Sequence, residues 1–424
     1  MDFLRILSDQ RREILSTDVS ALLTRKEEKE IRFDSPLAQV VVGVRRCGKS
    51  TLCKKVLIES GLKFGYINFD DERLADIKTD QLDRLVQVLY ELNGEFNLLF
   101  IDEIQNVHRW ELFVNRMLRQ GMHMVITGSN ANLLGGDLTT HLAGRFNEIK
   151  LYPFSFSEYC SVKGVSVNGV STIDQGLRQH YLNEYLFTGG FPEIVKGYVG
   201  DNYASDLLHT IIYKDICKRY KVRYKETIRT LANIVLDRVC QEQSAYKLAS
   251  DLEIKSFHTV ENYLSYLSDA YLICPVNRFS WKPVERRKIP KFYAIDNSFI
   301  SAHEGAIQSD VMGWRLENTV AVELLNRNEK AFDRLYYLKE TRDYEVDFVV
   351  VKNSGIHELI QVTYDFSDPS VKLYNREVGA LIKGAEKTKC ENLTLLIGNG
   401  EPRTVESKGH IVNIKRAADW LVGL

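Results

Sequence analysis

Short apolar runs alternate with amphipathic segments in the first third of the chain. Leu37–Val44 and Asn97–Ile101 are nearly continuous apolar runs, which are typical of parallel strands buried on both faces. Lys63–Phe69 and His123–Thr127 favour two more strands. Strands that alternate with helices predict a doubly wound α/β sheet. The intervening helices are predicted over residues 50–60, 80–92 and 110–120.

The periodicity changes twice further along the chain. From about residue 200 to 275 the pattern is almost wholly helical, and from about residue 290 strands return. We therefore predict three domains, over residues 1–200, 201–288 and 289–424, the first with an N-terminal helical stretch. The returning strands are predicted at Phe292–Ile295, Arg334–Leu338, Glu345–Val351, His357–Thr363 and Leu393–Ile397.

A glycine-rich loop follows the first predicted strand. Residues 43–50, GVRRCGKS, fit G-x-x-x-x-G-K-[ST] without exception, and the glycines let backbone N–H groups converge on phosphate oxygens at a helix N-terminus. Lys49 would reach the β and γ phosphates of ATP, and the Ser50 hydroxyl would hold Mg²⁺. The predicted nucleotide-binding residues are Gly43, Val44, Arg45, Arg46, Cys47, Gly48, Lys49, Ser50 and Thr51.

A pair of acids, Asp102 and Glu103, follows the strand over Asn97–Ile101. A carboxylate at the carboxyl end of a buried strand can hold the water shell of Mg²⁺, which is the role we assign to Asp102. Glu103 would polarise the attacking water as general base. Two adjacent acids beside a phosphate-binding loop favour hydrolysis over simple nucleotide storage. The sequence therefore predicts an ATPase that uses ATP and Mg²⁺.

Two further polar positions are candidates for catalysis. Asn130 follows the strand over His123–Thr127, and its side chain could contact the γ-phosphate or the water, or could belong to an ordinary turn. Arg145 lies further on. An arginine that reaches the γ-phosphate of a neighbouring subunit raises the rate about 10³–10⁵-fold where it operates. The alternative for Arg145 is a surface or structural role.

The composition bears on DNA binding, metal binding and cellular location. The formal net charge is −1, so any attraction to DNA must come from a local basic patch. The seven cysteines are scattered without a CxxC pair, which argues against a zinc site and fits reduced thiols in cytosol. The N-terminus lacks the apolar core of a signal peptide, and no stretch approaches eighteen uncharged apolar residues. We expect a cytoplasmic protein without a membrane partner.

Motifs along nearly the whole chain carry a resemblance to one family. They are VVGVRRCGKSTL at 41–52, LLFIDEIQNV at 98–107, ITGSNANLL at 126–134, HLAGRFNEIKLYPFSFSEY at 141–159, YLFTGGFPEIV at 185–195, KFYAIDNSFISA at 291–302, GWRLENTVAVELLNR at 313–327 and EVDFVV at 345–350. On these motifs the chain resembles the AAA-type ATPases with a C-terminal domain of the DUF4143 type. The resemblance implies an AAA-type fold in which the residues assigned above keep their roles. It matches Ser129 or Asn130 to a sensor position and Arg145 to an L-x-G-R motif. Action of Arg145 on the nucleotide of its own chain and action on that of a neighbouring subunit both stay open.

The helical middle contains a predicted helix–turn–helix over residues 244–255 and 256–274. Residues 275–291 resemble a β-wing, so we predict a winged-helix domain. Its second helix carries two acids and no lysine or arginine after Lys255, which disfavours sequence-specific contacts to DNA bases in the major groove. Contact with DNA phosphates and a purely structural or interaction role both stay open. The flanking basic residues are Lys214, Lys218, Arg219, Lys221, Arg223 and Lys225 before the helices, and Lys282, Arg286, Arg287, Lys288 and Lys291 after them.

The last predicted domain resembles the core of PD-(D/E)xK nucleases. Glu317 and Asp347 match two of its metal-binding carboxylates. The Glu-x-Lys position holds Gln361 and Thr363 instead, and threonine cannot replace an ammonium charge; Lys372 on the following helix is the candidate substitute. We therefore predict a nuclease-like domain with a degenerate site at Glu317, Asp347, Gln361 and Thr363.

Three functions are compatible with these features. The first is an ATPase whose hydrolysis drives an action on DNA in defence, repair or a mobile-element process. The second is a switch in which the ATP state controls a protein partner, with homo-oligomerisation also possible. The third is an active metal-dependent nuclease regulated by ATP.

Overall fold

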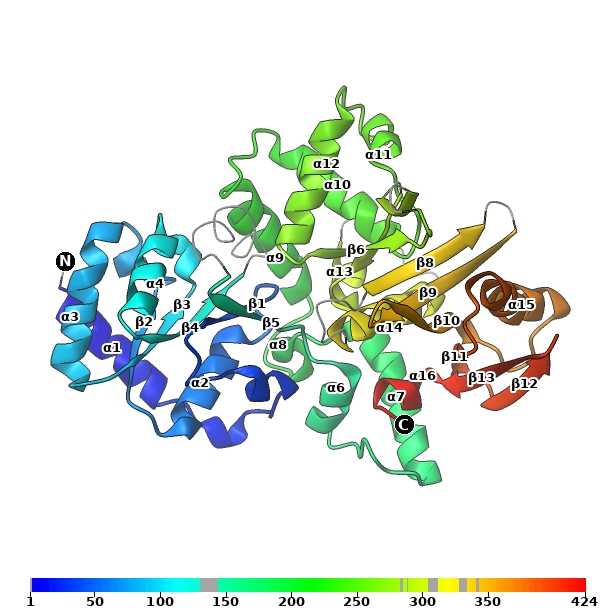
Figure 1. Cartoon of the computed structure of the whole chain (residues 1–424), viewed down its shortest axis with the longest axis horizontal. Coiled ribbons are helices and arrows are strands. Elements are labelled where there is room, and N and C mark those ends of the chain that lie inside the picture. The colour runs from blue at the N-terminus through cyan, green and yellow to red at the C-terminus, as the bar shows by residue number, and fades with distance from the viewer. Residues whose placement is uncertain are drawn as a thin grey trace. The chain divides into compact units, whose positions relative to one another are not determined.

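The structure is a computed structural model that describes residues 2–129, 144–282, 285–287, 289–303, 312–327, 334–340 and 343–424. It divides into two compact units (Figure 1). Unit 1 comprises Met1–Tyr152 and Asp269–Tyr271, and unit 2 comprises Pro153–Ser268 and Leu272–Leu424. The predicted division into three domains stays a prediction. In the described part of the chain no helix is long and apolar enough to cross a lipid bilayer.

Unit 1 is built on a five-stranded parallel sheet with the order β2-β3-β4-β1-β5. The four strands predicted from apolar runs are all present, and β5 is an addition. The predicted parallel α/β sheet of the P-loop ATPase type is thus confirmed. The strands are β1 (Ala38–Val42), β2 (Phe64–Asn68), β3 (Leu98–Asp102), β4 (His123–Gly128) and β5 (Phe146–Lys150).

Both faces of this sheet are covered, as continuous apolar strands require. Alternate residues such as Val40, Ile101 and Ile126 enter one core with side chains of α1, α3 and α4, while Val41 and Phe100 lie between them in the strands and are equally buried. The helices are α1 (Phe3–Leu15), α2 (Lys49–Ser60), α3 (Leu82–Asn93) and α4 (Trp110–Arg119). Short 3₁₀ turns lie at Val19–Ala21, Lys26–Glu30, Glu72–Leu74, Thr79–Gln81 and Ile104–Asn106.

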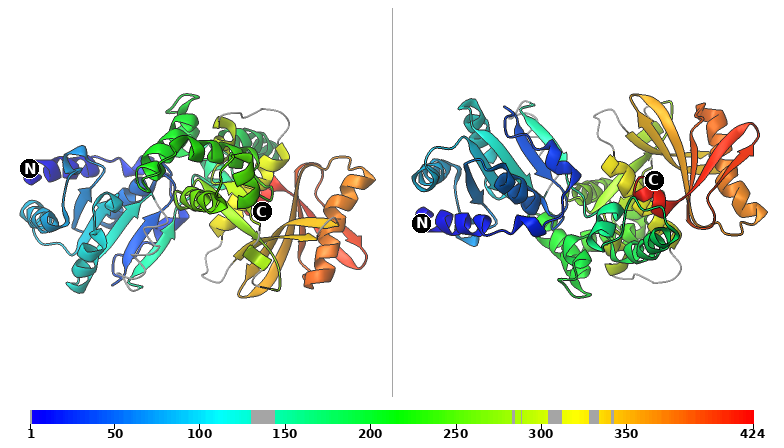
Figure 2. Two further views of the ribbon diagram at one scale, coloured as in Figure 1. Left: turned by 90° about the horizontal axis from the view of Figure 1, so that it is seen from above. Right: turned by 90° about the horizontal axis from the view of Figure 1, so that it is seen from below.

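Unit 2 begins with a helical region, as the periodicity predicts. Figure 2 shows these helices in green from two further sides. They are α6 (Phe156–Val162), α7 (Thr172–Thr188), α8 (Pro192–Val195), α9 (Tyr203–Thr210), a π-helix at Ile211–Cys217, α10 (Lys225–Asp237), α11 (Ala245–Asp251) and α12 (Phe257–Asp269).

The rest of unit 2 is a mixed eight-stranded sheet with the order β12-β13-β11-β10-β9-β8-β6-β7. α15 packs its apolar face on β9, β10 and β11. The strands are β6 (Ile273–Arg278), β7 (Lys291–Ala294), β8 (Arg334–Glu340), β9 (Tyr344–Lys352), β10 (Gly355–Asp365), β11 (Leu393–Asn399), β12 (Arg403–Ser407) and β13 (His410–Arg416). The helices are α13 (Asn297–Ala302), α14 (Met312–Arg327), α15 (Val371–Thr388) and α16 (Ala417–Leu421), with a 3₁₀ turn at Glu285–Arg287.

The segment predicted as a β-wing is part of this sheet. β6 pairs antiparallel with β7 and parallel with β8. The predicted role of Lys291 as a basic wing residue that meets phosphates is wrong, because its side chain is only 2% exposed and is enclosed by carboxylates. Lys288 lies outside the described residues. A winged-helix domain and a nuclease-like domain both stay predictions.

A buried clasp joins two motifs of unit 2 that lie far apart in the sequence. Gly190 donates its backbone N–H to Asp296 Oδ2 at 2.7 Å, and the rings of Phe191 and Phe299 lie 5.1 Å apart. Asp296 also accepts the Ser298 N–H at 2.9 Å. The TGGFPE and AIDNSF segments therefore hold one another through a carboxylate buried in unit 2.

The Asp296 carboxyl gives the stability of unit 2 a defined pH dependence. Burial outweighs the hydrogen bonds from Ser298 and Gly190 and raises its pKa from 3.8 to about 6. Between these values the folded state keeps a proton that the unfolded state has lost, so stability falls as pH rises from about 4 to about 6. The contribution is about 3 kcal/mol. In urea unfolding, the stability of the wild type relative to Asp296→Asn should shrink by about this amount between pH 4 and 7, and a constant difference would contradict the assignment.

Candidate active site

A glycine-rich loop joins β1 to α2 in unit 1. A Cβ on Gly43 would lie 2.1 Å from the Leu151 carbonyl oxygen, so glycine is required there. Arg46 and Gly48 have φ angles of 68° and 101°, which place both in left-handed backbone. Gly48 is the N-cap of α2. Strand, left-handed loop and helix N-terminus follow one another, which is the arrangement that binds phosphate oxygens.

Lys49 is held against this loop. Its side chain is 4% exposed, and Nζ donates to the carbonyl oxygens of Gly43 at 3.1 Å and Val44 at 3.0 Å. The carbonyl oxygens of the loop therefore hold the Lys49 ammonium against the loop backbone. A phosphate would gain from that ammonium and from the N-terminus of α2 together.

Asp102 links the loop to the end of β3. Ser50 Oγ donates to Asp102 Oδ1 at 2.8 Å, and Thr127 Oγ1 donates to the same oxygen. Burial and the adjacent Glu103 charge raise the pKa of Asp102 despite those two hydrogen bonds. A bound cation would favour the anionic carboxylate.

The oxygens of Ser50 and Asp102 fit a magnesium ion that shares its ligands with a nucleotide. A hydroxyl and a carboxylate oxygen lie side by side there, and Mg²⁺ usually takes one or two protein oxygens together with phosphates and waters. Among the described residues no group of three or more His, Cys, Asp or Glu could hold a metal.

Glu103 is fixed by groups that the sequence did not identify. Its φ is 53°, and its backbone N–H donates to Thr127 Oγ1 at 3.1 Å. The Gln105 amide donates to the Glu103 carboxylate and lies 3.4 Å from Ser129 Oγ. Gln105 occupies the 3₁₀ turn directly after the acids, so its place two residues beyond Glu103 was the available signal.

The strand order explains why these residues meet. β4 lies between β1 and β3, so the carboxyl end of β4 stands between the loop and the acid pair. That end supplies Thr127 and Ser129. Asn130 lies outside the described residues, so its predicted role stays a prediction.

The structure does not bring Arg145 to the loop of its own chain. Its carbonyl accepts the Ala38 N–H at 3.1 Å, which puts Arg145 at the amino ends of β1 and β5, opposite the loop edge. Its exposed guanidinium donates to Asn115 Oδ1 at 3.3 Å. Action on a neighbouring subunit stays a prediction.

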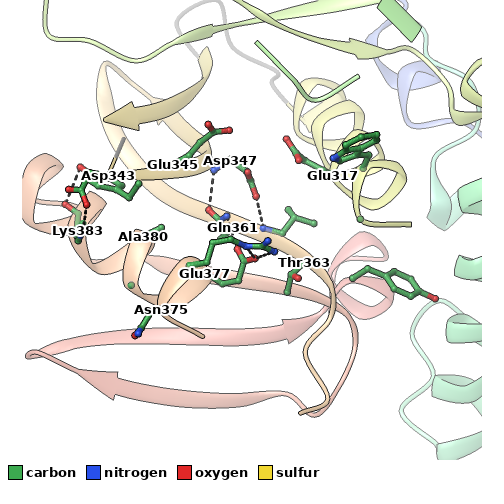
Figure 3. Close-up of a pocket in the computed structure, with 17 residues that line it drawn as sticks. Glu317, Asp343, Glu345, Asp347, Gln361, Thr363, Asn375, Glu377, Ala380 and Lys383 are labelled. Atoms are coloured by element: carbon green, nitrogen blue, oxygen red, sulfur yellow. Dashed lines mark hydrogen bonds and ion pairs between the residues drawn. The ribbon is translucent and has the colours of Figure 1, made fainter. Parts of the chain in front are cut away.

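The four residues predicted as a degenerate nuclease site line one cavity of about 400 Å³ in unit 2 (Figure 3). Glu317 comes from α14, Asp347 from β9, and Gln361 and Thr363 from β10. Lys372, the suggested substitute lysine, is exposed and does not line the cavity.

Gln361 has a bonding role in this cavity. Its Oε1 accepts the Asp347 N–H at 3.2 Å, and its Nε2 donates to Glu377 Oε2 at 2.8 Å. Asp347 Oδ2 accepts the Val362 N–H at 2.9 Å. Glu377 and Glu345 also line the cavity, and the sequence did not identify either. The polar groups of β9 and β10 thus bond largely to one another.

Family comparisons support the first part of the sequence interpretation. Residues 35–160 match the family model of an AAA domain, so the predicted AAA-type ATPase domain is confirmed. Residues 179–310 match a domain of unknown function, DUF8612. The expected DUF4143 domain is not shown. The DUF8612 match includes both segments of the Gly190–Asp296 clasp.

The chain is also similar to whole proteins. It is 34% identical over 413 residues to the uncharacterized protein MJ1544 of Methanocaldococcus jannaschii, covering 92% of this chain and 89% of that protein. An uncharacterized protein of Haemophilus influenzae is 29% identical over 366 residues, with 82% and 88% covered. The AMPPCP-bound DnaA structure from Aquifex aeolicus is 12% identical, with 59% of this chain and 90% of that chain covered and a TM-score of 0.28.

Proposed function

Because the chain belongs to the same family as MJ1544 of Methanocaldococcus jannaschii and contains an AAA domain, we propose that it binds ATP with Mg²⁺ and hydrolyses it. The observation that carries this proposal is the 2.8 Å hydrogen bond from Ser50 Oγ to Asp102 Oδ1. It brings the loop and the end of β3 to one point.

Each side chain of the site has a task in this proposal. Lys49 contacts the phosphates, and the N-terminus of α2 holds their negative charge. Ser50 and Asp102 hold Mg²⁺, which neutralises charge on the phosphates. Glu103 takes a proton from the attacking water, and Gln105 orients its carboxylate. The hydrogen bond from the Gln105 side-chain amide restrains the Glu103 carboxylate. Binding of ATP and the attacking water would therefore need to break or share that hydrogen bond.

The test is hydrolysis by wild type and by Lys49→Met, which removes the ammonium and keeps most of the side chain. We expect the variant to lose activity about 100-fold or more, because a cation aimed at the transferred phosphate is lost. Lys63→Met is the matched control, since Lys63 is exposed and directly precedes β2, at the edge of the sheet opposite the loop. Equal losses in the two variants would refute the role of Lys49.

We extend the proposal to DNA through the exposed basic residues that precede α10 and begin it. Lys218, Lys221, Arg223 and Lys225 are exposed, and the Arg223 guanidinium lies 5.3 Å from the Tyr224 ring. Such residues would contact phosphates with a strong salt dependence. Hydrolysis stimulated by DNA at low salt, with the stimulation lost at high salt, supports this extension. Hydrolysis indifferent to DNA favours the switch that controls a protein partner.

A further inference from the structure

Lys291 lies at the centre of a group of acids in unit 2. Its Nζ is 2.6 Å from Glu345 Oε1, 3.2 Å from Glu317 Oε1 and 3.8 Å from Asp347 Oδ1. We call Glu317, Glu345 and Asp347 the acid cluster. The hydroxyl of Tyr293, two residues along β7, donates to Glu317 Oε1 at 2.9 Å. One ammonium from β7 thus meets carboxylates from α14 and β9.

Burial and the neighbouring carboxylates act on the pKa of Lys291 in opposite directions. Burial alone would lower the pKa of Lys291, but the charges of Glu317, Asp347 and Glu345 raise it well above its ordinary value. Burial would likewise raise the pKa of Glu345, but the ammonium groups of Lys291 and Lys339 leave it lowered. Burial and the Glu317 charge raise the pKa of Asp347. The Lys291 side chain is 2% exposed and its Nζ lies within 4 Å of a carboxylate oxygen of all three acids, so the acid cluster encloses this ammonium.

A metal-dependent nuclease needs carboxylate oxygens that are free to bind Mg²⁺. The acid cluster does not fit this need. Glu317 and Glu345 face the Lys291 ammonium, and Asp347 Oδ2 accepts the Val362 N–H. Gln361 is bonded at both ends of its amide, to Asp347 and Glu377. A cation that entered the acid cluster would have to displace a buried ammonium.

We propose that the Lys291 ammonium takes the place of a divalent cation. It offsets the negative charge of the acid cluster, so that the cluster and the cavity beside it bind no divalent metal. The inference is independent of ATP hydrolysis in unit 1. It replaces the third function considered from the sequence, an active metal-dependent nuclease, with a metal-free pocket. Thr363 stands where the nuclease motif has a lysine. In this structure β7 supplies a lysine to the same acids, as a structural cation.

The test uses nucleotide-free full-length protein and Mn²⁺ followed by electron paramagnetic resonance. We expect wild type to bind no Mn²⁺ at the acid cluster, and its melting temperature to ignore the ion. Lys291→Met should melt roughly 10 °C lower, because the buried carboxylates of Glu317 and Asp347 and the partly exposed Glu345 lose their cation. It should also bind Mn²⁺ and regain part of the loss. Lys339→Met is the control: Lys339 pairs with Glu345 Oε2 at 2.9 Å from a more exposed position, and its loss should create no Mn²⁺ site.

Two results would overturn the proposal. The first is Mn²⁺ binding by wild type that disappears in Asp347→Asn. The second is a folded Lys291→Met that neither binds Mn²⁺ nor is stabilised by it. If Lys291→Met does not fold, the wild-type measurement with Asp347→Asn still decides, because binding sensitive to that change refutes the proposal and its absence supports it.

Discussion

Glu103→Gln is expected to lower kcat for ATP hydrolysis by about 10²–10⁴-fold while ATP binding is kept. The amide has nearly the shape of the carboxylate but cannot accept a proton from water. Its oxygen can still accept the hydrogen bond from Gln105, so the turn at Ile104–Asn106 should be preserved. The loop that contacts the phosphates is unchanged, so the dissociation constant for ATP should change little.

The measurement is kcat by phosphate release together with ATP affinity by calorimetry. Glu95→Gln is a suitable control, because Glu95 is an exposed acid just before β3. It should leave both quantities near those of wild type. A Glu103→Gln variant that hydrolyses ATP at the wild-type rate would remove Glu103 as general base and shift attention to another acid.

Gly189→Ala is expected to destabilise unit 2 by about 3 kcal/mol or more. Gly189 has a φ of 70°, and a Cβ there would lie 1.7 Å from Asp296 Oδ1. Asp296 would have to move, which would leave the buried N–H groups of Gly190 and Ser298 without their acceptor. Strain in left-handed backbone adds to this loss.

Gly197→Ala separates the two causes. Gly197 also has a φ of 70°, but a Cβ there meets nothing within 4 Å. It should therefore report backbone strain alone, at about 1 kcal/mol. Urea unfolding of both variants gives the comparison. Similar losses in the two would show that the contact with Asp296 contributes little to the stability of unit 2.

Local pattern predicted most of unit 1. Nearly continuous apolar runs identified β1 and β3, because a strand buried on both faces needs apolar residues at every position, and β2 and β4 were also predicted as strands. The contact of Leu151, which directly follows β5, with Gly43 could not be predicted in the same way, since three of the five β5 residues (Asn147, Glu148 and Lys150) are polar and the segment looks unlike a buried strand. The motifs also predicted that Lys49 follows the glycine-rich loop and that Asp102 follows a buried strand; in the structure Lys49 begins α2, Asp102 ends β3, and Ser50, next to Lys49, donates to Asp102.

The bonding partners within each site were less accessible to sequence. Gln105 and Thr127 act through their hydrogen bonds to Glu103 and Asp102, and no pattern reports such bonds. The sequence predicted Lys291 only as one of several basic residues in the predicted β-wing. Its partners lie on α14 and β9, and only the strand order of the sheet brings them together. Contacts between residues distant in the chain are fixed by topology rather than by local periodicity.

The central claim is tested most directly by phosphate release from ATP, measured for wild type across a range of Mg²⁺ concentrations. The account predicts release that saturates with ATP, rises with Mg²⁺ and stops when the metal is chelated, because Mg²⁺ held by Ser50 and Asp102 would neutralise charge on the phosphates. Release that is absent at every Mg²⁺ concentration, from folded protein, would contradict the proposed ATPase.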